Sequence, residues 1–132
     1  MSKSERARTG ERLWTQAAEL HLSALNAEAA HLQTALRSLA RNPNDSIVDR
    51  SNDLLDKYLD FSNWLVESAP PLGTEDAVAE LSSVAGVYRL AAIGFRRLLI
   101  AGTATSPNLL TSCNALLEQG SIHSNKFHSL TN

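Results

Sequence analysis

Four aspartates recur at helical spacing between residues 49 and 60: Asp49, Asp53, Asp56 and Asp60, at intervals of 4, 3 and 4. This spacing places the carboxylates on one side of a helix, and carboxylate oxygens are ligands that Mg²⁺ accepts. Asp53, Asp56 and Asp60 are therefore candidate metal ligands of a helical hydrolase that acts on phosphates. Such an enzyme also needs carboxylates from a second helix, and the next segment offers only Glu80 beyond its first turn. We therefore favour a solvated acidic stripe and predict no metal site.

Two further groups have residue types that could carry chemistry. Glu28 and His31 have the Glu-x-x-His spacing of di-iron carboxylate bundles, but such a site needs two of these pairs and the chain has one. Cys113, the single cysteine, stands at an apolar position and is expected to be a small buried hydrophobe. The chain has no Gly-rich phosphate loop, no Cys-x-x-Cys pair and no Gly-x-Ser-x-Gly motif. The sequence therefore leans against an enzyme and predicts no cofactor.

The composition favours a single all-helical domain over residues 1–132. Hydrophobic residues make up 43% of the chain and aromatic residues only 5%, which is typical of helices packed through Leu and Ala. Residues 45–80 carry two basic and nine acidic side chains, whereas both flanking segments are net positive. Such blocks favour attraction between segments or toward a partner. They lack the dominant basic face of a nucleic-acid binder, so we predict no nucleic-acid partner.

The expected environment is the cytoplasm. One cysteine cannot form an internal disulfide, and the N-terminus does not resemble a signal peptide. The most apolar stretch, Val84 to Gly102, contains Arg89, Arg96 and Arg97. Three arginines within 19 residues cost too much for a membrane span, so none is predicted.

Breakers at residues 42–44, 70–73 and 102–107 divide the chain into four segments with helical periodicity. The predicted helices cover about 4–40, 46–68, 75–101 and 107–119. Gly120 costs helix stability, so the fourth helix is expected either to end near 119 or to continue, with a kink, to 130.

Apolar residues in these segments follow intervals of 4 and 3, the pattern by which helices pack side by side. We therefore predict an up-down antiparallel four-helix bundle with a long first helix. The predicted inward positions are Ala18, Leu22, Leu25, Ala29, Leu32, Leu36 and Leu39 in the first helix, and Ala77, Leu81, Val84, Tyr88, Ala91, Phe95 and Leu98 in the third. In the fourth they are Leu109, Cys113, Leu116, Gly120, His123, Phe127 and Leu130.

Two features suggest that the bundle is completed by another molecule. The first helix is longer than its companions, and its N-terminal part would carry Leu13 and Trp14 beyond the bundle. The third helix has apolar residues around most of its circumference, which indicates either an additional contact with another molecule or a central position in a less regular packing of this chain. The predicted interface, most simply that of a homodimer, consists of Leu13, Trp14, Arg89, Ile93, Arg96 and Ile100.

The sequence is therefore compatible with three functions. The favoured one is a non-enzymatic interaction module, an adaptor, chaperone-like or regulatory protein that binds itself or another helical protein. The first alternative is the metal-dependent hydrolase described above. The second alternative binds a small molecule or lipid inside the bundle, in a pocket lined by Tyr58, Phe61, Trp64, Tyr88 and Phe95.

Overall fold

The computed structural model describes the backbone of residues 3–37, 46–100 and 107–131, and the side chains of residues 5, 8–36, 49–96 and 111–131. The described backbone is helical except for the connection at residues 68–74. Its helices are α1 (Lys3–Arg37), α2 (Ser46–Glu67), α3 (Glu75–Ile100) and α4 (Pro107–Thr131). The prediction of an all-helical protein with four helices is confirmed. The predicted helix ends at residues 40 and 101 lie outside the described residues.

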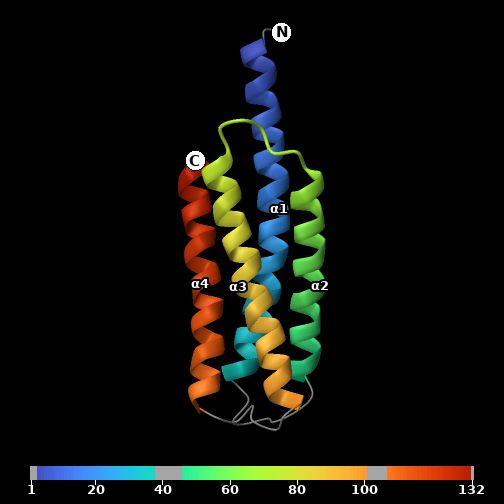
Figure 1. Ribbon diagram of the computed structural model, residues 1–132, viewed down its shortest axis with the longest axis vertical. Coiled ribbons are helices and arrows are strands. Elements are labelled where there is room, and N and C mark those ends of the chain that lie inside the picture. Colours follow the sequence, from blue (N-terminus) through green and yellow to red (C-terminus); the bar gives the residue numbers. More distant parts are fainter. Residues whose placement is uncertain (1–2, 38–45, 101–106, 132) are drawn as a thin grey trace.

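The four helices lie side by side (Figure 1). α3 packs against α2 and most extensively against α4, and α1 packs against α2 and, less extensively, against α4. In Figure 1 the N-terminus, the connection between α2 and α3, and the C-terminus lie at one end of the molecule. At that end, the first turns of α1 extend past the other helices.

The connection between α2 and α3 depends on two residues in the left-handed region of backbone conformation, Ala69 (φ 48°) and Gly73 (φ 88°). Pro70 and Pro71 follow the end of α2 after Ser68 and Ala69, and proline disfavours continuation of a helix. Thr74 directly precedes α3, and its hydroxyl donates to the Pro71 carbonyl oxygen at 2.5 Å. These contacts turn the chain sharply from α2 into α3.

The core is continuous and aliphatic in character. The predicted inward positions of α1 from residue 18 to 36 are buried, as are those of α3 from 77 to 95. The buried hydrophobic residues are Trp14, Ala18, Leu22, Leu25, Ala29, Leu32 and Leu36 of α1, Leu54 and Phe61 of α2, Ala77, Leu81, Val84, Ala85, Tyr88, Ala91, Ala92 and Phe95 of α3, and Cys113, Leu117 and Phe127 of α4.

The predicted inward line of α4 is wrong at three of its described positions: Leu130 is 53% exposed, and the line is displaced by one residue at two others. Leu117 and Ser124 are buried where Leu116 and His123 were expected, and the helix continues through Gly120 to Thr131 without an end. Gly120 is itself buried. Its packing partner, described below, explains why a glycine is present inside this helix.

α3 is the most apolar helix by sequence. Its stretch Glu75–Arg96 is long and apolar enough to cross a membrane by length and composition, a property that core helices of soluble proteins share. In the structure the inward side of this helix is part of the core, between α2 and α4.

Candidate functional site

The seam between α1 and α2 is filled by stacked aromatic rings. Trp14 and Trp64 stack with ring centroids 5.9 Å apart, and His21 stacks on Trp64 at 4.8 Å. The Trp14 indole N–H donates to the Ser68 hydroxyl oxygen at 3.0 Å. The expectation that Trp14 extends beyond the bundle is therefore wrong, because α2 reaches the level of Trp14 and buries its ring. Its neighbour Leu13 is 57% exposed.

A second line of apolar residues runs along the outer side of α1. Leu13, Ala17, Leu20 and Ala24 follow intervals of 4, 3 and 4, and Leu20 is 74% exposed. Ala17, between the two leucines, and Ala24, after Leu20, have small side chains that leave room for the backbone of another helix to approach closely. Leu20 was not among the predicted interface residues. Its signal was a second set of 4 and 3 intervals, displaced from the inward set of α1.

The aspartates of α2 border this apolar line. Asp53, Asp56 and Asp60 are exposed. Asp60 lines an open hollow together with His21 and Ala24 of α1, so the aspartates lie on the side of α2 toward α1. We call this combined surface the aspartate face; it consists of Leu13, Ala17, Leu20 and Ala24 of α1 and Asp53, Asp56 and Asp60 of α2.

The structure does not assemble the candidate metal ligands into a site. Asp53 forms an exposed ion pair with Arg50 at 3.7 Å. Among the described residues, no group of three or more His, Cys, Asp or Glu side chains could hold a metal ion. Glu28 and His31 lie 3.7 Å apart on the surface of α1. Asp53, Asp56 and Asp60 are exposed to solvent in the single chain.

The predicted pocket residues occupy different environments. Phe61, Tyr88 and Phe95 are buried in the core, whereas Tyr58 and Trp64 are half-buried at its edge. Trp64 borders two open hollows, one with His21 and Asp60 and the other with Leu13 and Pro71. The five aromatic side chains thus form parts of the packed core and of the α1–α2 seam.

A polar network crosses the core at Tyr88. Its hydroxyl donates to the Asn26 side-chain oxygen of α1 at 2.7 Å, and the Ser124 hydroxyl of α4 lies 3.2 Å from the same oxygen. The Tyr88 ring occupies the space that a β-carbon on Gly120 would need. Burial raises the pKa of Tyr88 to about 12. This network joins three helices through one acceptor atom.

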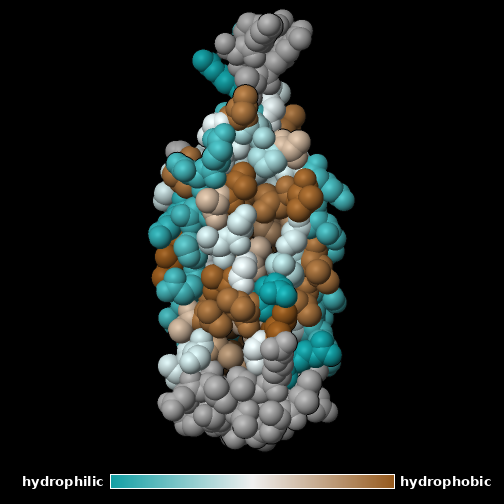
Figure 2. All heavy atoms as spheres, in the orientation of Figure 1, coloured by the Kyte–Doolittle hydropathy of each residue, from teal (hydrophilic) through white to brown (hydrophobic). Residues whose placement is uncertain are grey.

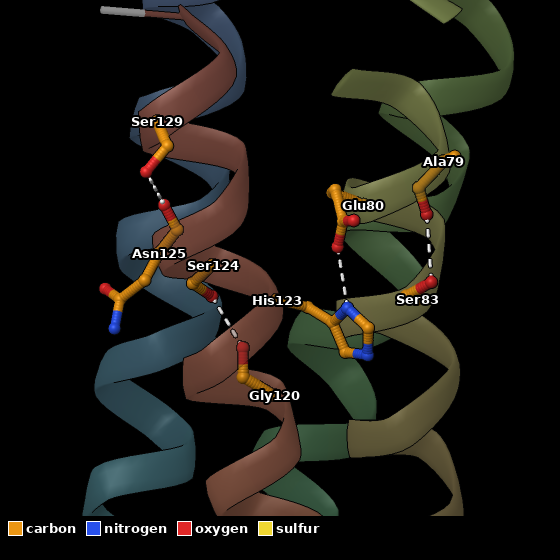
Figure 3. Close-up of polar contacts among 8 residues, drawn as sticks. All are labelled: Ala79, Glu80, Ser83, Gly120, His123, Ser124, Asn125 and Ser129. Atoms are coloured by element: carbon orange, nitrogen blue, oxygen red, sulfur yellow. Dashed lines mark hydrogen bonds and ion pairs between the residues drawn. The ribbon is translucent and has the colours of Figure 1, made fainter. Parts of the chain in front are cut away.

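A second polar contact joins α3 and α4 nearer the surface. The Nδ1 atom of His123 lies 2.6 Å from Oε2 of Glu80, and both side chains are about three-quarters buried (Figure 3). The Ser124 hydroxyl donates to the Gly120 carbonyl oxygen at 2.9 Å one turn back, beside this pair (Figure 3). His123 is therefore at the flank of α4, where it holds α3, while the smaller Ser124 points inward.

The outward side of α3 mixes arginines with apolar residues. Arg89 and Arg96 are exposed, Leu90 is 57% exposed and Ile93 is half-buried. The Ile100 side chain lies outside the described residues. Figure 2 shows hydrophobic residues gathered in patches over the middle of the face that includes α3, with hydrophilic residues mainly along its two sides. We call this surface the arginine face; it consists of Arg89, Leu90, Ile93 and Arg96 of α3 and the half-exposed Leu59 of α2.

No protein-family model, curated protein or solved structure matches this chain.

Proposed function

We propose that this protein is a non-enzymatic interaction module that acts by helix–helix contact and forms a homodimer. The observation that carries the proposal is the pair Leu13 and Leu20, one heptad apart on the outer side of α1 and both more than half exposed. Apolar side chains aligned in this way on a surface helix mark a protein-interaction surface. Ala17 between them and Ala24 after Leu20 are small side chains that suit the close approach of a second helix.

We further propose the up-down antiparallel topology for the bundle. The support comes from Figure 1, where the colours of successive helices run in alternate directions along the molecule. Such a bundle presents flat helical faces on its sides, and a partner helix can lie along them.

The polar side chains of the interior support a structural role for the groups that could carry chemistry. His123 and Glu80 bind each other across α3 and α4, and Tyr88 binds Asn26. Burial raises the pKa of the Cys113 thiol, which lowers its nucleophilicity at neutral pH. A buried free thiol suits a reducing compartment, so we propose the cytoplasm. We also propose that the protein has neither a membrane span nor a nucleic-acid partner.

The two alternatives have less support. A hydrolase would need the exposed aspartates of α2 to meet ligands from another helix. A binder of small molecules in the interior would need space where Phe61, Phe95 and Tyr88 are packed. A different helical protein as the partner remains the main competitor to a second copy.

Sedimentation equilibrium tests the proposal. A homodimer doubles the 14.3 kDa monomer mass, and Leu20→Asp should weaken the association at least about tenfold, because it places a charge at the centre of an apolar contact. Ile122→Asp on α4 is the matched control, since Ile122 is also a half-exposed apolar residue on a different helix. A wild-type chain that stays monomeric up to millimolar concentration would overturn self-association.

A further inference from the structure

The aspartate face and the arginine face lie on opposite sides of the outward surface of α2. His21 and Ala24 of α1 share a hollow with Asp60, so the aspartates point toward α1. On α3, Glu80 bonds to His123 of α4 and marks the side that faces α4. Arg89 follows Glu80 by nine residues, which turns it by roughly 180° around the helix, onto the side of α2. The two faces carry opposite charge and each contains exposed leucines.

Two contacts fix the relative levels of the helices along the bundle. Trp14 stacks on Trp64, and α1 and α2 run in opposite directions in Figure 1. Twelve residues along α1 lead from Trp14 to Asn26, and twelve residues back along α2 lead from Trp64 to Asn52. All α-helices rise by the same amount per residue, so Asn26 and Asn52 lie at the same height along the bundle axis. We call residues at the same height level with one another.

The same contacts align charged and apolar residues of the two faces. Tyr88 hydrogen-bonds to Asn26, so Arg89 lies at the level of Asp53, the residue after Asn52. Leu20 precedes Asn26 by six residues and Leu59 follows Asn52 by seven, so these two leucines also share a level. Opposite charges and exposed leucines thus occur at matching heights on the two faces.

We infer that the second copy docks with its arginine face on the aspartate face, about a two-fold axis parallel to the helices. Rotation about such an axis leaves every residue at its height along the bundle. It also forms the contact twice, since each copy presents its arginine face to the aspartate face of the other. Arg89 then meets Asp53 of the partner subunit, and Leu20 meets Leu59 of the partner subunit. This inference rests on the proposed self-association and specifies its surfaces. Leucines and alanines supply apolar burial, while the charge pairs at the rim select the orientation.

Cross-linking between two single-cysteine variants tests the pairing directly. Asp53→Cys and Arg89→Cys are prepared separately in a Cys113→Ala background and treated with a short bis-maleimide. We expect a cross-linked dimer when the two variants are mixed and little when either is treated alone, because the two-fold axis brings position 53 next to position 89. Equal cross-linking in the separate samples, or none in the mixture, would overturn the pairing.

Charge reversal provides a second, independent test. Arg89→Asp and Asp53→Arg should each raise the dimer dissociation constant about tenfold, because each brings like charges together across the contact. The double variant Asp53→Arg/Arg89→Asp should return the constant to within about threefold of the wild type, since the pair is restored in reverse. Arg12→Asp, which reverses an exposed arginine elsewhere on α1, is the control.

The outcomes separate the two proposals. A wild-type protein that is monomeric overturns self-association and this pairing together. A wild-type dimer in which the double variant is weaker than either single variant overturns only the pairing. Circular dichroism of every variant establishes that each reversal leaves the helices intact.

Discussion

The ring of Tyr88 on α3 lies where the side chain of residue 120 on α4 would otherwise be, so that Gly120 and Tyr88 fit only as a pair. A β-carbon at position 120 would overlap the ring. The glycine that weakens α4 as an isolated helix therefore permits the Tyr88 ring of α3 to pack directly against α4. Several measurable consequences follow from this pair and from the contacts around it.

Gly120→Ala should lower the free energy of unfolding by about 1–3 kcal/mol, because the ring or the helix must move to admit a methyl group. Chemical denaturation measures the change. Gly86→Ala is the matched control: a β-carbon there meets open space, so the helix should gain about 0.5–1 kcal/mol. If both alanines stabilise the protein, the close contact with Tyr88 is absent in solution.

Alkaline pH should destabilise the protein through Tyr88. Burial raises the pKa of Tyr88 from 10.0 to about 12. Below pH 10 the phenol is neutral in both the folded and the unfolded state, so its ionisation does not reduce the free energy of unfolding. As pH rises through 12 the unfolded state ionises first, and roughly 2–3 kcal/mol of stability is lost. Denaturation between pH 9 and 12 should show this loss in the wild type and not in Tyr88→Phe; an identical pH dependence in both would contradict the assignment.

Trp14→Ala should lower the free energy of unfolding by about 3–5 kcal/mol, because it removes a buried ring from the core. Leu13→Ala should cost less than about 1 kcal/mol, since the Leu13 side chain is largely exposed in the single chain. Thermal denaturation at low protein concentration separates these effects from dimerisation. If both variants lower the free energy of unfolding by the same small amount, Trp14 is exposed, as the sequence suggested.

Ala69→Gly should raise the free energy of unfolding by about 0.5–1 kcal/mol, because a residue with a β-carbon is strained at positive φ. Ala69 is exposed and has φ of 48°. Ala115→Gly, at an exposed site inside α4, should instead lower the free energy of unfolding by about 1 kcal/mol. A loss at both positions would show that Ala69 does not adopt the left-handed conformation in solution.

The parts of the fold that could be predicted depend on local pattern. The inward line of α1 has an uninterrupted set of 4 and 3 intervals, and helix breakers mark the turn before Thr74. These features need no knowledge of distant residues. The same holds for the aspartates of α2, whose shared side and exposure follow from spacing alone.

The parts that could not be predicted depend on partners far away in sequence. In α4, the lines through Leu116 and through Leu117 have similar spacing. The choice between them follows from contacts with distant residues: the Ser124 hydroxyl lies 3.2 Å from the Asn26 side-chain oxygen of α1, and His123 lies 2.6 Å from Glu80 of α3 at the flank of α4. The aspartate face could not be predicted for the same reason, because it combines residues of α1 and α2 and requires knowing which sides of these two helices are adjacent.

The shared acceptor of Asn26 has a consequence for the ancestry of the chain. Three residues, Asn26, Tyr88 and Gly120, depend on one another, and a change in any one leaves a buried polar group or an overlap. Substitutions at exposed positions outside the aspartate face and the arginine face are free of this constraint and can accumulate. An amide, a phenol ring and a glycine separated by 62 and 32 positions therefore form a compact signature for distant homologues whose remaining sequence has diverged beyond alignment.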